Sequence, residues 1–181
     1  MERYIALLRG VNVGGKNKIP MPGLKAAFET AGFLEVGTYI NSGNIIFSAG
    51  EADVVALQQA CRQAIMDTFQ LDIAVAVLSA KDLREALAHA PAWWDGEEAS
   101  KHNAIFVIAP ADPDSVIASV GRLKPEYEQV SHYGRIIFWS APLETFSRTR
   151  WSKIVSTSAY GSVTIRNANT AKKLSQLVQS T

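Results

Sequence analysis

A glycine-rich basic stretch near the start of the sequence contains the residue types that bind phosphate. It reads GVNVGGKN, and its Gly10, Gly15 and Lys16 match the glycine and lysine positions of a phosphate-binding loop. The hydroxyl residue that should follow and bind magnesium is replaced by Asn17. The next five residues, KIPMP, keep the loop away from a helix start, because a residue before proline avoids helical angles. We therefore expect no nucleoside triphosphatase of this class.

Two interpretations of this loop remain open. In the first, glycines let backbone N–H groups converge on an anion, and nearby basic and amide side chains add charge and hydrogen bonds. In the second, the loop is a long crossover that needs glycine only for left-handed backbone angles. The candidate ligand-binding residues of the first interpretation are Arg9, Asn12, Gly14, Gly15, Lys16 and Lys18.

Two further polar clusters could contribute to the same site. NSGN has the composition of a hairpin tip, and it supplies the candidates Asn41, Ser42 and Asn44. RNANT precedes the last helical pattern, where Asn169 or Thr170 could cap the helix. Its candidates are Arg166, Asn167 and Asn169. Each cluster taken alone is typical of local structure, so the functional interpretation depends on the clusters meeting in space.

Other chemistries have little support in the residue pattern. His89, His102 and His132 lack metal-ligand spacing, so no metal site is predicted. No serine occupies a G-x-S-x-G motif, and Glu97-Glu98 lies in an acidic linker where solvation explains it. A single cysteine, Cys61, excludes an internal disulfide, and its helical context predicts a small buried hydrophobe. Catalytic residues and cofactors stay unknown.

Composition and charge bound the class of protein. The chain has 181 residues, of which 48% are hydrophobic and 19% charged, which is typical of a globular fold. Its net charge is only +1, but residues 1–25 and 145–181 are strongly basic and the stretch between them is acidic. No apolar run is long enough to span a membrane, and no signal peptide is evident. We expect a cytoplasmic protein, with an oligomeric state that the sequence does not define.

The elements that must position these residues follow a repeated order. Apolar periodicity predicts strands and helices in the order β-α-β-β-α-β over residues 4–79, the ferredoxin-like pattern. A helix over 80–90 and a linker carrying two tryptophans lead to a strand at 103–109. The second half then predicts a helix at 112–123, a hairpin around Gly134, a helix at 151–159, a strand at 162–166 and a last helix at 171–178.

The repeat predicts an α+β fold of two ferredoxin-like units in tandem, with a connecting helix and a C-terminal helix. The hairpins SGNIIFSAG and YGRIIFWSAP also resemble each other, which favours an internal duplication. The predicted boundaries are 1–79 for the N-terminal subdomain, 80–102 for the connecting helix and linker, and 103–181 for the C-terminal subdomain. The four tryptophans are expected in the core or between subdomains, with base stacking as the alternative.

The stretch LLRGVNVGGKNKIPMPGLKAAFETAGFLEVGTYINSGNIIFSA and the later TIRNANTAKKL resemble a bacterial family, domain of unknown function 1697. The resemblance covers nearly the whole chain and implies an α+β fold with ferredoxin-like subdomains. It implies no activity. Family members usually carry an aromatic residue in the closing motif where this chain has Ala168, which argues against ligand stacking there.

Three function classes are compatible with these observations. The first is a protein that binds an anionic, phosphate-bearing small molecule through the Gly10–Lys18 loop and the basic C-terminal segment. The second is a nucleic-acid-binding protein, although the third strand lacks the basic and aromatic signature of ferredoxin-like RNA-binding modules. The third is an enzyme, although the three polar clusters offer lysine and arginine but no carboxylate or histidine.

Overall fold

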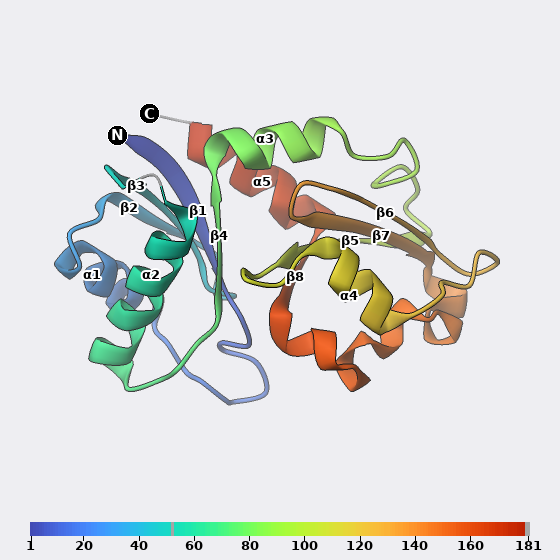
Figure 1. Ribbon diagram of the computed structural model, residues 1–181, viewed down its shortest axis with the longest axis horizontal. Helices are drawn as coiled ribbons and strands as arrows, with labels where there is room; N and C mark the ends of the chain where they lie inside the picture. The colour runs from blue at the N-terminus through green and yellow to red at the C-terminus, as the bar shows by residue number, and fades with distance from the viewer. Residues whose placement is uncertain (52, 180–181) are drawn as a thin grey trace. The chain divides into compact units, whose positions relative to one another are not determined.

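A computed structural model describes residues 1–51 and 53–179 of the chain, which folds into two α+β units (Figure 1). One unit comprises the described residues of Met1–Leu83 together with residues 173–179, and the other comprises Arg84–Lys172. The predicted subdomain boundaries, after residues 79 and 102, follow the repeated order of elements, whereas these two units are defined by contacts within each. The predicted boundaries therefore stay predictions. In the described residues, no helix is long and apolar enough to cross a bilayer.

The first unit contains a four-stranded antiparallel sheet with the order β2-β3-β1-β4. Its first crossover passes through α1 and its second through α2, which completes the predicted β-α-β-β-α-β order. The elements are β1 (Glu2–Leu8), α1 (Met21–Thr30), β2 (Leu34–Tyr39), β3 (Asn44–Ala49), α2 (Val54–Phe69) and β4 (Val75–Ser79). The ferredoxin-like prediction for this half is confirmed.

The core of the first unit lies between one face of this sheet and the two helices. Phe28 of α1 and Phe47 of β3 pack edge to face with ring centroids 5.8 Å apart, and both are fully buried. Cys61 of α2 is also fully buried in this core, and burial raises the pKa of its thiol. The prediction that Cys61 is a small buried hydrophobe is therefore confirmed.

The second unit repeats the same topology with the sheet order β6-β7-β5-β8. Trp139 and Trp151 are buried in its core, as the sequence predicted. The elements that make up the unit or join it to the first are α3 (Ala80–Ala88), β5 (Ser100–Val107), α4 (Pro113–Val120), β6 (Gln129–Tyr133), β7 (Ile136–Pro142), β8 (Val163–Asn167) and α5 (Ala168–Gln179). The chain thus contains two ferredoxin-like sheets, as predicted.

The second crossover of this unit differs from the prediction. The expected helix over 151–159 is replaced by two short 3-10 segments, η2 (Trp151–Ser156) and η3 (Ser158–Ser162), and a third, η1 (Leu143–Arg148), precedes them. Hydroxyl side chains compete here for the backbone: Thr149 and Thr157 each donate from Oγ1 to the carbonyl three residues earlier, at 2.8 Å. Strand β5 also begins at Ser100, inside the predicted linker.

Candidate functional site

The Gly10–Lys18 loop is a small ordered hairpin. The N–H of Lys16 donates to the carbonyl of Val13 at 3.1 Å, which closes a four-residue turn. The two central residues, Gly14 and Gly15, have φ angles of +58° and +74°. Positive angles at both positions define a type I′ turn, for which glycine is favoured. The glycines therefore have a conformational role in shaping the tip of the loop.

Asn12 fixes the base of this loop. Its Nδ2 donates to the carbonyls of Ile19 and Asn41, both at 2.9 Å, and its Oδ1 accepts from the N–H of Ile19 at 2.8 Å. Asn17 adds a bond from its Nδ2 to the carbonyl of Gly10 at 3.1 Å. The side-chain amides of both asparagines are thus committed to the backbone, and their observed role is to hold the loop.

The bond from Asn12 to the carbonyl of Asn41 joins the loop to the predicted NSGN cluster, which forms the turn between β2 and β3. The N–H of Leu8 donates to the carbonyl of Gly43 at 2.9 Å, so the turn lies against the end of β1. Asn44 is fully buried, and its Nδ2 donates to the carbonyl of Tyr39 at 3.0 Å and to Ser42 Oγ at 2.8 Å. Two of the three predicted clusters therefore meet in the first unit.

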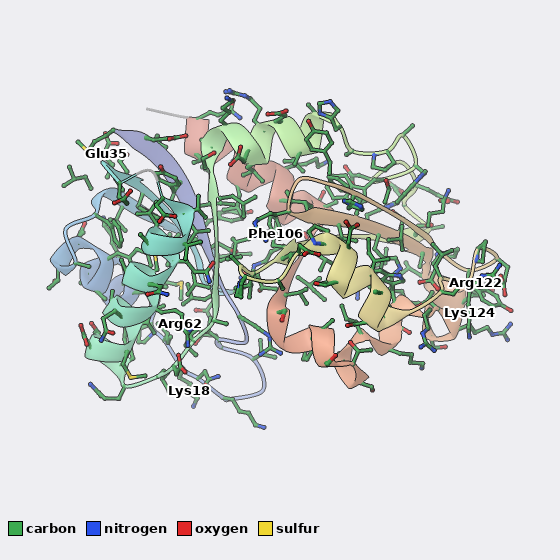
Figure 2. The ribbon with its side chains drawn as sticks, viewed as in Figure 1. Lys18, Glu35, Arg62, Phe106, Arg122 and Lys124 are labelled. Carbon is green, nitrogen blue, oxygen red and sulfur yellow. The ribbon has the colours of Figure 1, made fainter. Side chains whose placement is uncertain are left out.

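The two lysines of this loop differ from three other basic residues of the first unit in having no carboxylate partner among the described residues. Lys16 and Lys18 are exposed, and neither forms an ion pair with any residue among 1–51 and 53–179. Figure 2 labels Lys18. By contrast, Arg3, Lys25 and Arg62 pair with Glu35, Glu29 and Asp72, at 3.1, 3.9 and 2.5 Å. Arg9 is half-buried at the start of the loop. The loop thus presents two lysines without a neutralising carboxylate.

Replacing Asn12 with aspartate is expected to lower the free energy of unfolding by about 2 kcal/mol, because two backbone carbonyls would lose their donor and face a carboxylate. Aspartate preserves the size of the side chain, the acceptor for Ile19 and tolerance of the positive φ. Urea denaturation followed by circular dichroism measures the loss. Asn17→Asp is the control, since it removes one hydrogen bond. An equal loss of stability in the two variants would contradict the role of Asn12 in holding the base of the loop.

Arg166, from the third predicted cluster, is a buried cation in the second unit. Arg166 belongs to β8. Its Nη1 donates to Thr164 Oγ1 at 2.7 Å and to the carbonyl of Ile165 at 3.0 Å. Removal from water disfavours the charged form, and this burial lowers the pKa of Arg166 to about 10. The cluster's arginine is therefore embedded in the unit and does not extend into solvent.

The two asparagines of this cluster line a cleft of about 770 Å³ in the second unit. Asn167 Oδ1 accepts from the N–H of Thr170 at 2.8 Å and so caps α5, which corrects the expectation that Asn169 or Thr170 caps a helix beginning at 171. Asn169 is exposed. The cleft is also lined by Asp95, Glu97, Glu98, Lys101 and His102. Acidic side chains therefore outnumber basic ones around Asn167 and Asn169.

Sequence reasoning missed a serine–histidine contact in this region. His102 Nδ1 lies 2.6 Å from Ser140 Oγ, and His102 Nε2 lies 2.7 Å from the carbonyl oxygen of Glu97. His102 and Ser140 face each other across β5 and β7, so their contact depends on strand register and has no motif in the sequence. Among the described residues, no cluster of histidine, cysteine, aspartate and glutamate could hold a metal ion.

The predicted site residues are thus distributed over both units. Those of the loop and of the β2–β3 turn contact one another in the first unit. Arg166, Asn167 and Asn169 belong to the second unit, so a single site built from all three clusters stays a prediction.

Comparison with known proteins finds a matching family model and a similar solved structure. A family model described as a protein of unknown function (DUF1697) matches residues 1–138. The solved structure of a conserved bacterial protein, SP0830 from Streptococcus pneumoniae, is similar, with a TM-score of 0.89 and 33% sequence identity over 99% of each chain. No curated protein matches the sequence.

Proposed function

This chain belongs to the DUF1697 family of proteins of unknown function, and we propose that it binds an anionic, phosphate-bearing small molecule through the Gly10–Lys18 loop. One observation carries the proposal. Lys16 and Lys18 are exposed on a hydrogen-bonded hairpin, and no carboxylate in the described part of the chain pairs with either ammonium group.

A loop that hydrogen bonds already hold in one conformation favours binding, because little further conformational entropy is lost when the ligand binds. The Asn12 and Asn17 amides hold the backbone, which leaves the two lysines as the groups that contact the anion. A lysine ammonium binds phosphate as a point charge, so two such groups on one small hairpin suit a compact, multiply charged anion. Arg9, at the start of the same loop, adds a third positive charge to the region.

The basic C-terminal segment contributes less to this proposal than the sequence suggested. Lys172 pairs with Asp95, and Arg150 Nε donates to the carbonyl of Val120 at 2.6 Å. Arg166 is buried. These three cations already have partners or lie away from solvent, whereas Lys153 and Lys173 of the segment are exposed. The proposal places the ligand on the loop because Lys16 and Lys18 lie together on one hairpin.

Thermal unfolding with added ligands tests this function. Pyrophosphate, sugar phosphates, nucleotides and short oligonucleotides are compared on the native protein and on the double variant Lys16→Ala/Lys18→Ala. A small anion present at 100 times its Kd is expected to stabilise the native protein by about 2.7 kcal/mol and the double variant far less. Lys25→Ala is the matched control, because Lys25 is an exposed lysine of the same unit that pairs with Glu29.

Other outcomes separate the alternatives. Stabilisation by oligonucleotides alone, with an affinity that falls steeply as salt rises, would replace this proposal with nucleic-acid binding. Equal stabilisation of the native protein and the double variant by a small anion would place the ligand elsewhere and contradict the role of the loop.

A further inference from the structure

One edge strand of the second unit's sheet, β6, lacks common features that keep an edge from pairing with another chain. β6 lies at one end of the order β6-β7-β5-β8, and in the part of the chain that the structure describes it pairs, in regular register, with β7 alone. Its sequence, QVSHY, contains no proline, lysine or acidic residue, and its pairing has no bulge. The edge strand β2 of the first unit differs, because its register shifts between Leu34 and Gly37. Bulges, prolines and lysines are common devices that keep an edge from pairing with another chain, and β6 has none of these three.

A largely apolar groove runs beside this edge. It has a volume of about 740 Å³ and lies between α4 and β6. Val130 and His132 of β6 face the helix side, because their cross-strand partners Trp139 and Ile137 belong to the core on that face. The groove is lined by Ile117, Ala118, Gly121, Arg122, Leu123, Val130, Ser131, His132 and Trp151. An edge strand and an adjoining helix thus form its two walls.

The two ends of the groove carry different charges. His132 Nε2 lies 3.5 Å from Asp114 Oδ1, near the start of α4. At the other end of α4, Arg122 lines the groove and Lys124 follows two residues later. Figure 2 places both labelled side chains on the segment that follows α4. Both are exposed, and neither forms an ion pair within the described residues. A carboxylate would complement this end.

We propose that the α4–β6 groove binds an extended peptide segment of a partner protein, which adds as a strand to β6. An edge strand offers every second N–H and C=O group to a partner, which an extended peptide can match along its length. Because strand side chains alternate with a period of two, apolar residues at alternate peptide positions would enter the groove against Ile117 and Leu123. An acidic residue at one peptide end would pair with Arg122.

A second copy of this chain fits the groove less well than such a peptide. Pairing of β6 with its own counterpart would supply no carboxylate from the paired strand itself, since β6 contains neither aspartate nor glutamate. It would also leave the cationic Arg122 end without a complement. The occupant that matches both the edge and the charge is an apolar, acidic, extended segment.

Amide chemical-shift mapping by NMR tests the proposal with a defined probe. The probe is an N-acetylated hexapeptide of sequence Val-Thr-Val-Thr-Val-Asp, and the comparison peptide carries proline in place of the central valine. We expect saturable shifts at the amides of Val130 and His132 with the probe and none with the proline peptide. Proline removes a main-chain donor and so breaks the ladder.

Variants at the groove sharpen the test. Arg122→Ala is expected to weaken binding about five- to tenfold, the size of a charge-assisted hydrogen bond lost at an exposed site. Ala118→Glu, at an exposed helix position, should abolish binding by filling and charging the groove, with circular dichroism confirming the fold. Lys153→Ala is the control, because Lys153 is exposed and does not line the groove.

Three results would overturn the proposal. These are the absence of shifts at millimolar probe, equal binding of the proline peptide, and shifts at β6 that depend on protein concentration without any peptide. The last result would assign the edge to a second copy of the chain. None of them affects the anion-binding loop, which lies in the other unit.

Discussion

Replacing Gly43 with alanine is expected to lower the free energy of unfolding by roughly 3–5 kcal/mol, from backbone strain and steric overlap together. Gly43 has a φ of +80°, which alanine adopts only at a cost. A Cβ at this position would lie 2.7 Å from Val11 Cγ2 and 2.8 Å from Leu8 Cβ. Both neighbours are buried, so neither can move aside easily. Urea denaturation followed by circular dichroism measures the loss.

Gly14→Ala separates the two causes. Gly14 also has a positive φ, +58°, but a Cβ there would meet nothing within 4 Å. This control should therefore lose only the conformational part, about 1–2 kcal/mol. Equal losses in the two variants would contradict the close packing of the β2–β3 turn against the end of β1. That packing matters for function because Asn12 clamps the proposed binding loop to the same turn.

Replacing Glu128 with alanine is the second large effect, with an expected loss of about 3–5 kcal/mol. Glu128 is only 3% exposed, and its carboxylate accepts three backbone N–H groups. Its Oε2 accepts from Arg150 at 2.5 Å and from Lys124 at 3.1 Å, and its Oε1 accepts from Trp151 at 3.0 Å. The carboxylate thus joins the segment before β6 to the start of η2. Alanine would leave these donors without an acceptor.

Tryptophan fluorescence provides a probe of this unfolding, since Trp151, whose backbone N–H is one of the three donors, is among the fluorescent residues. All four tryptophans of the chain lie between residues 93 and 151, so the signal reports on the second unit alone. Glu126→Ala, which truncates an exposed glutamate two residues away, is the control and should change stability by less than about 0.5 kcal/mol. A loss below about 1 kcal/mol for Glu128→Ala would mean that water replaces the carboxylate at little cost.

The first unit was predictable from the sequence because its local signals agree with one another. Asp53 accepts from the N–H of Val55 at 3.0 Å and caps α2, and apolar residues recur along that helix with helical spacing. The second unit was less predictable at its second crossover. Trp151 and Ile154 are buried as a helix would require, but the hydroxyls of Thr149 and Ser152 donate to backbone carbonyls and the segment forms 3-10 turns.

The candidate site was predictable in part. The residue types of the loop were apparent from sequence, and the amide of Asn12 does bridge to Asn41. The role of that amide was not apparent, because only the folded geometry shows it bonded to carbonyls. The contact between His102 and Ser140 could not be foreseen, since it joins residues on neighbouring strands whose register is a property of the whole sheet. The groove beside β6 likewise arises from tertiary packing.

The measurement that tests the central proposal most directly is an NMR titration of the protein with pyrophosphate, observed at the amides of Gly14 and Gly15. Binding to the Gly10–Lys18 loop predicts saturable shifts at these two tip glycines in the native protein and in Lys25→Ala, and loss of the shifts in Lys16→Ala/Lys18→Ala. Unchanged glycine amides at millimolar pyrophosphate, or equal shifts in the double variant, would contradict the proposal that this loop binds phosphate-bearing anions through its two lysines.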